Sequence, residues 1–206
     1  MKKQAYFKEQ LHELLYQALE TERGGIKIYQ TALSCVQNED LKDEWEEYLE
    51  QTRTHEQVLL TLLGELGLEP DTITPGREVV AHIAASLGSA MTIAKKQGST
   101  AAAQLVACEC VVLAETKDHL NWELIGHVAG QGQGDEITML KTAFDLVEQE
   151  EEHHLHHTKG FARELWIESL GLPAVLPPPE EVKKVESAIA AARAELQRDD
   201  MLKSQH

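Results

Sequence analysis

The segment "LVEQEEEHHLHHTKGF", residues 146–161, places carboxylates and imidazoles in the middle of a long helical pattern. Val147, Glu151, His154, Thr158 and Phe161 follow one another at steps of three or four residues, so they share one face of a helix. The apolar members at both ends indicate that this face points into a core. The segment therefore predicts a buried helix face that becomes polar halfway along its length.

Three other segments show the same interruption. We expect long helices over residues 5–37, 38–67, 100–129 and 135–169, each with an apolar face that turns polar near its middle. Four long helices with short or medium connections bury their apolar faces most simply as an antiparallel four-helix bundle, which brings their midpoints to one level. The sequence therefore predicts an all-α fold crossed by one polar layer, made of Glu22, His55, Glu115, His119, Glu151 and His154.

Two further helices are expected outside these four. A short helix over about 77–96 lies between the second and third long helices, and the proline-rich stretch "GLPAVLPPP" (171–179) ends the bundle. We therefore divide the chain into a bundle, 1–170, and a C-terminal part, 171–206. The latter contains an amphipathic fifth helix with a thin apolar stripe, expected to lie on the outside of the bundle or on a partner chain. The stripe consists of Val182, Val185, Ile189 and Leu196.

Composition restricts the class of protein. Among 206 residues, 42% are hydrophobic and 26% charged, and the net charge is −16, which argues against a nucleic-acid partner. No apolar run approaches the roughly 18 residues of a membrane span, and the first residues are too polar for a signal peptide. The three cysteines have no zinc-binding spacing. We expect a cytoplasmic homodimer with no membrane contact.

The polar layer suggests bound metal. Burying Glu22, Glu115 and Glu151 together costs several kcal/mol each unless they are protonated or meet a cation. Two divalent ions would carry +4 against about −3 from these carboxylates, with neutral imidazoles as further ligands. Glu151 and His154 lie three residues apart and can bind one ion together; Glu150 with His153 is the competing register. A metal-free hydrogen-bonded network is the alternative explanation of the layer.

These residues resemble the ferritin-like superfamily of dinuclear carboxylate proteins. In that pattern two helices each give one Glu, and the other two each give Glu-x-x-His. Glu22 with Tyr29 is similar to the first-helix Glu and nearby Tyr of the bacterioferritin branch. Glu115 matches the lone third-helix Glu, and Glu151 with His154 the fourth-helix pair.

The second helix departs from this pattern, because Thr52 stands three residues before His55 where the family has Glu. Glu56, or His119 one turn beyond Glu115, could take the vacant coordination. The stretch "YLEQTRTHEQVLLTLLGELGLEP", residues 48–70, is also similar to the second helix of YciF-type stress proteins, a ferritin-like group with a shorter helix between helices two and three.

The resemblance implies two iron or manganese ions per chain that react with oxygen or peroxide, as in an oxidase or a stress-defence protein. Tyr29 would have a catalytic role by supplying or relaying an electron, and Trp122 is a second candidate. Two other functions remain open. The chain is either a catalytically silent helical scaffold with a metal-free polar core, or a metal buffer that uses the "HHLHH" cluster, residues 153–157. Outside that last case, we expect His153, His156 and His157, which lie off the inward face of their helix, to be solvated or to support other ligands.

Overall fold

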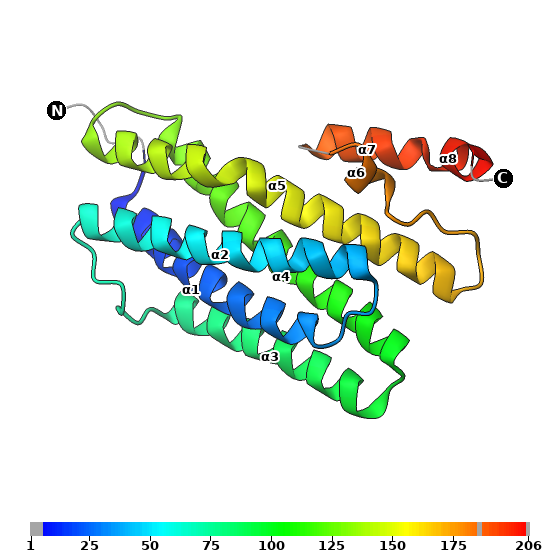
Figure 1. Cartoon of the computed structure of the whole chain (residues 1–206). Coiled ribbons are helices and arrows are strands. Elements are labelled where there is room, and N and C mark those ends of the chain that lie inside the picture. Colours follow the sequence, from blue (N-terminus) through cyan, green and yellow to red (C-terminus); the bar gives the residue numbers. More distant parts are fainter. Residues whose placement is uncertain (1–5, 185–186, 205–206) are drawn as a thin grey trace.

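The computed structural model describes residues 6–184 and 187–204, and within these ranges it contains helices and no strand (Figure 1). The all-α expectation is confirmed. In chain order the helices are α1 (Lys8–Leu33), α2 (Glu39–Glu65), α3 (Pro75–Gln97), α4 (Thr100–Ala129), α5 (Asp135–Ser169), α6 (Pro179–Val182), α7 (Ala188–Leu196) and α8 (Arg198–Ser204).

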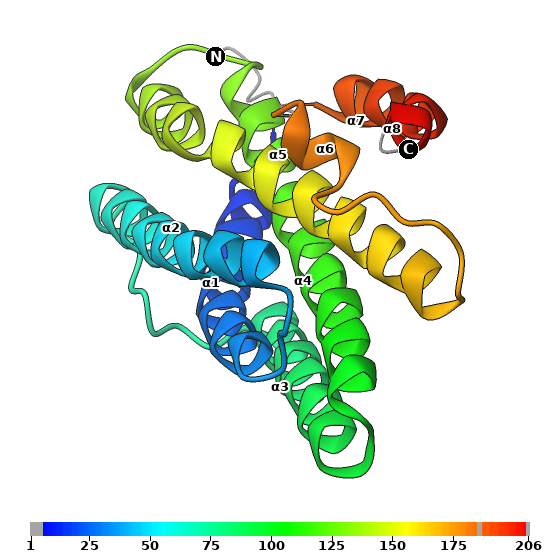
Figure 2. The same ribbon diagram turned by 45° about the vertical axis from the view of Figure 1, so that its right-hand side comes forward.

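Four long helices form a closed ring of contacts. α1 packs against α2 and α4, and α5 packs against the same two helices, so α1, α2, α5 and α4 surround one core. α3 lies outside this ring, against α1 and α4, and the five helices α1 to α5 alternate in direction along the chain, so that α2 and α4 run the same way (Figure 1). α6 and α7 pack on the outer side of α5 (Figure 2). No helix in the described part of the chain combines the length and apolarity needed to cross a bilayer.

Local side chains set the helix ends. Asn38, Thr74 and Ser99 each accept a hydrogen bond from the backbone N–H three residues further on, which satisfies one free donor at the start of α2, α3 and α4. α1 ends at Leu33, whereas the sequence predicted an end at residue 37. The turn that follows is held by Gln104 of α4, whose side-chain oxygen accepts from two consecutive backbone N–H groups at 2.6 and 2.7 Å.

Two expectations about the outer helices are corrected. α3 has 23 residues, three more than expected, because the Thr74 cap and Pro75 start it two residues early; it is still the shortest of the helices α1 to α5. The single C-terminal helix is wrong: Lys184 has a positive φ of 48° just after α6, and Ser187 caps a new helix, α7. Its expected apolar stripe is exposed at all three described positions, Val182, Ile189 and Leu196, while Val185 lies outside the described residues.

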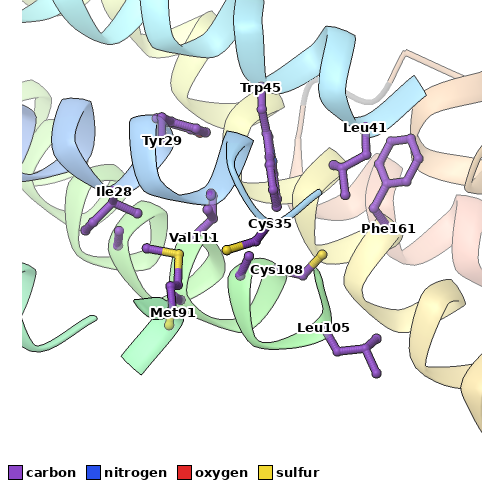
Figure 3. Close-up of a cluster of buried hydrophobic side chains, with 14 of the residues drawn as sticks. Ile28, Tyr29, Cys35, Leu41, Trp45, Met91, Leu105, Cys108, Val111 and Phe161 are labelled. Carbon is purple, nitrogen blue, oxygen red and sulfur yellow. The ribbon is translucent and has the colours of Figure 1, made fainter. Parts of the chain in front are cut away.

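The core consists of two apolar clusters. One, drawn in Figure 3, contains Tyr29, Trp45, Cys108 and Phe161 and is built from the C-terminal parts of α1 and α5 and the N-terminal halves of α2 and α4. The other contains residues from the opposite halves of the same four helices, with Leu15, Leu59, Trp122, Leu140 and Val147 among them. Along each helix the polar residues of the predicted layer fall between its contributions to the two clusters, so the layer separates them.

Candidate metal centre

Five of the predicted ligands are buried in the layer between the apolar clusters. Glu22, His55, Glu115, Glu151 and His154 are each at most 3% exposed, and they come from all four helices of the ring. These residues contribute to two groups of possible ligands, and within each group the ligand atoms all lie within 4.8 Å of one another. One group is His55, Glu151 and His154, and the other is Glu22, Asp118 and Glu151. Glu151 belongs to both groups, so the layer has one imidazole-rich half and one carboxylate half.

In the imidazole-rich half, both histidines direct Nδ1 toward Glu151. The distance from Nδ1 to Oε1 of Glu151 is 2.9 Å for His55 and 3.7 Å for His154. Their other nitrogens face outward: Nε2 of His55 lies 2.8 Å from Glu150, and Nε2 of His154 lies 2.7 Å from the side-chain oxygen of Gln51. A proton on Nε2 donates to these oxygens and leaves the Nδ1 lone pair free to bind a cation, an arrangement common to metal-binding histidines.

In the carboxylate half, one oxygen of Glu22 accepts a hydrogen bond from Nε1 of Trp122 at 2.8 Å. This bond fixes the carboxylate and leaves its second oxygen, Oε2, without a well-aligned hydrogen-bond partner among the described residues. Glu115 lies beside both halves, with Oε2 at 3.6 Å from Nδ1 of His154. The layer therefore presents carboxylate oxygens at its centre rather than at its margin.

Asp118 is a candidate ligand that sequence reasoning missed. It is 4% exposed and lies in the carboxylate half, while the predicted His119 has a side chain 26% exposed and faces Glu152 at 3.9 Å. Following the helix face from Glu115 by four residues leads to His119, whereas three residues lead to Asp118. Both steps fit a helix. The acidic side chain of Asp118, three positions after the buried Glu115, is the one feature of the sequence that favours the step of three residues.

The other suggested substitute for the missing Glu lies outside the layer. Glu56 has a side chain 20% exposed and accepts a hydrogen bond from Arg23 at 3.0 Å. Thr52 is buried, donates to the backbone oxygen of Tyr48 at 2.7 Å, and packs beside Gly25, so α1 and α2 approach closely at this level. The structure thus brings together five of the seven predicted ligands and leaves Glu56 and His119 outside.

Unpaired polar atoms in the layer test whether a cation fits. Several buried atoms have no well-aligned hydrogen-bond partner within the described part of the chain: Glu22 Oε2, His55 Nδ1, Glu115 Oε2, Asp118 Oδ1, both carboxylate oxygens of Glu151, and His154 Nδ1. Leaving one such atom unpaired costs about 1–3 kcal/mol; because Nδ1 of His55 and Oε1 of Glu151 lie 2.9 Å apart and can share a proton, five of the seven atoms carry this penalty. All seven are acceptors or potential lone-pair donors, and a bound cation satisfies atoms of this kind.

The acid–base properties of the layer agree with this need for positive charge. Burial raises the pKa of Glu22 and of Asp118 well above their usual values, and the neighbouring carboxylate of Glu151 raises both further. Burial alone would lower the pKa of His55, but its contacts with Glu150 and Glu151 outweigh burial and raise it to about 10. Protons therefore supply the positive charge when no metal does.

Tyr29, the predicted catalytic residue, is fully buried beside the layer. Its ring centroid lies 6.2 Å from that of His154 and 6.4 Å from that of Tyr48, and its hydroxyl has no hydrogen-bond partner within the described residues. Burial raises its pKa well above the usual value, and Glu115 adds to the effect. Tyr29 is thus held as a neutral phenol next to the imidazole-rich half.

A cavity of about 480 Å³ lies between α4 and α5 and reaches the layer. Glu151 and Trp122 form its inner wall, and His119 and Glu152 are also among its lining residues. The cavity therefore ends at residues of the carboxylate half, while the carboxylate oxygens of Glu151 themselves stay buried.

The chain was also compared with known proteins. No protein-family model, no curated protein and no solved structure showed a significant match to it.

Proposed function

We propose that this chain is a ferritin-like protein that binds two iron or manganese ions in the polar layer and reacts there with oxygen or peroxide. The observation that carries the proposal is the position of Glu151, which belongs both to the group with His55 and His154 and to the group with Glu22 and Asp118. A carboxylate shared by two ligand groups is the arrangement that bridges two ions.

Charge supports two ions rather than one. Glu22, Glu115, Asp118 and Glu151 are all buried and together carry −4 when ionised, which balances two divalent cations. The three carboxylates that the sequence predicted carry only −3, which leaves one positive charge of two divalent ions unbalanced. Asp118, on α4, supplies the fourth carboxylate that the family places on the second helix and that Thr52 does not provide.

The reaction follows from what such ions do when bound: iron or manganese supplies the electrons that reduce oxygen or peroxide. The protein holds the ligand atoms in position through the outward hydrogen bonds of His55 and His154 and the bond from Trp122 to Glu22. The two apolar clusters on either side exclude water from the layer. Tyr29, buried beside His154, is placed to donate an electron or a proton.

The test is metal content and iron oxidation in protein purified without a histidine tag. We expect about two iron or manganese ions held in the layer, and oxidation of added Fe²⁺ by oxygen or peroxide that Glu151→Gln abolishes. Glu168→Gln, at an exposed position of the same helix, is the matched control and should behave as the unmodified chain.

Two results would contradict the proposal. A layer that binds neither ion and a chain that oxidises no Fe²⁺ would indicate the catalytically silent scaffold. Loosely held zinc or nickel that is lost when His153 and His156 are replaced, but kept in Glu151→Gln, would indicate a metal buffer.

A further inference from the structure

A second group of potential ligands lies outside the layer, where the C-terminal segment crosses α5. Nδ1 of His157 lies 2.8 Å from Oε2 of Glu181 and 3.6 Å from Oε2 of Glu44. The three residues come from α5, α6 and α2, and their ligand atoms lie within 4.8 Å of one another. His157 was expected to be solvated or to support other ligands, but it is only 5% exposed.

The segment that brings Glu181 to this place is firmly docked. Both nitrogens at the end of Arg163 bind the carboxylate of Glu180, at 2.6 and 2.8 Å, and Glu180 is 3% exposed. Glu164, fully buried, accepts from the backbone N–H of Val175 at 2.8 Å and from Arg198. These contacts hold α6 against α5, so Glu181 is positioned by the fold.

The close approach of α6 depends on a glycine. A Cβ at Gly160 would lie 2.7 Å from the carboxylate of Glu180 and 3.1 Å from Pro178, so any side chain here would push the segment away from α5. Gly160 stands one turn beyond His157 on the same helix. The glycine at position 160 therefore leaves room for α6 at the level where Glu181 contacts His157.

The geometry suits a cation. Ligand atoms about 2.1 Å from a divalent transition metal lie about 3.0–3.4 Å apart, and the distances of 2.8 and 3.6 Å bracket this range. Oε2 of Glu181 is buried without a well-aligned hydrogen-bond partner in the described ranges. Tyr48 adds a hydroxyl, which donates to Glu44 and lies 3.1 Å from Nδ1 of His157. Two carboxylates balance one divalent ion.

We propose that Glu44, His157 and Glu181 form a third, mononuclear site for a divalent transition-metal ion such as Mn²⁺, Fe²⁺ or Zn²⁺. The site is adjacent to the layer, because the ring of Tyr48 lies 4.3 Å from that of His154. It is nevertheless separate, because it shares no ligand with the layer, and it requires the C-terminal segment.

The experiment counts bound Mn²⁺ by equilibrium dialysis, with free Mn²⁺ measured by electron paramagnetic resonance. The unmodified chain should bind one ion more than Glu181→Gln, and Glu44→Gln, which approaches the site from α2, should lose the same single ion. Glu195→Gln, at an exposed position of α7, is the matched control and should keep the full count.

The difference of one ion does not depend on the proposed function. If the layer binds two ions, the unmodified chain should bind three and Glu181→Gln two. If the layer binds none, the unmodified chain should bind one and Glu181→Gln none. Equal counts in the unmodified chain and Glu181→Gln would overturn the proposal. Loss in Glu181→Gln with full retention in Glu44→Gln would also overturn it, because that result means only that the segment had detached.

Discussion

Replacing Asp118 by Asn should stabilise the metal-free protein and weaken its metal binding. Asp118 is 4% exposed and has carboxylate oxygens of Glu22 and Glu151 within 4.8 Å. Two unit charges at that distance repel by about 3.5 kcal/mol at an effective dielectric constant of 20. Asn has the same shape and no charge, and its amide can donate to Glu22.

Protonation limits the gain. The folded protein can avoid the repulsion by keeping Asp118 protonated, which at pH 8 costs at most about 5.6 kcal/mol for a carboxyl with an ordinary pKa of about 3.9. Glu22, whose pKa is raised for the same reason, relieves part of the repulsion. We therefore expect Asp118→Asn to raise the free energy of unfolding of the metal-free chain by about 3–5 kcal/mol at pH 8, and by almost nothing near pH 4.

The assay is urea unfolding at pH 4 and pH 8 after treatment with a chelator, repeated at pH 8 with saturating Mn²⁺. With Mn²⁺ the order should reverse, because the unmodified chain has one more ligand for the ions. Asp43→Asn, at an exposed position of α2, is the matched control and should change little in any condition. If Asp118→Asn destabilised the metal-free protein at pH 8, or bound Mn²⁺ as tightly as the unmodified chain, the reasoning would be refuted.

Three further outcomes are expected. Each Mn²⁺ ion bound in the layer at a hundred times its Kd should stabilise the chain by about 2.7 kcal/mol, or about 5–10 °C in Tm, and calorimetry of Glu151→Gln should show a much smaller shift. Metal-free stability should fall as pH rises, since the raised pKa of His55 gives stability that is present below about 6.5 and lost toward 10, and the raised pKa of Glu22 acts in the same direction; rising stability over that window would contradict this sign. Gly24→Ala should lower the free energy of unfolding by about 1–2 kcal/mol because its Cβ would lie 2.7 Å from that of Ala84, whereas Gly88→Ala, with open space around it, should raise it by up to about 1 kcal/mol.

The long helices were predictable because their signals are local. Apolar spacing, capping residues such as Ser99, and glycine-rich breaks fixed the start and end of α4 and α5 as observed. The C-terminal helix was not predictable in this way, because its apolar spacing is regular although Lys184, just after α6, has a positive φ, and α6 docks on α5. That docking depends on buried ion pairs of Arg163 and Glu164 with residues far along the chain, which spacing alone does not reveal.

The height of the polar layer along the helices was predictable, because the apolar face of each long helix turns polar near its midpoint. Recognising this pattern requires little knowledge of how the helices pack. The choice of individual side chains was harder. Asp118 and His119 are neighbours on α4, and the orientation of the helix decides which one faces Glu22 and Glu151. His157 was assigned to a solvated role because it lies off the inward face of α5, yet the C-terminal segment covers it.

The most direct test of the dinuclear centre is a crystal structure of the Mn²⁺-loaded chain, with anomalous diffraction used to locate the ions. We expect two anomalous peaks in the layer, one from an ion bound by His55, Glu151 and His154 and one from an ion bound by Glu22, Asp118 and Glu151. A layer that shows no anomalous peak at saturating Mn²⁺, with its carboxylates joined only by protons, would contradict it.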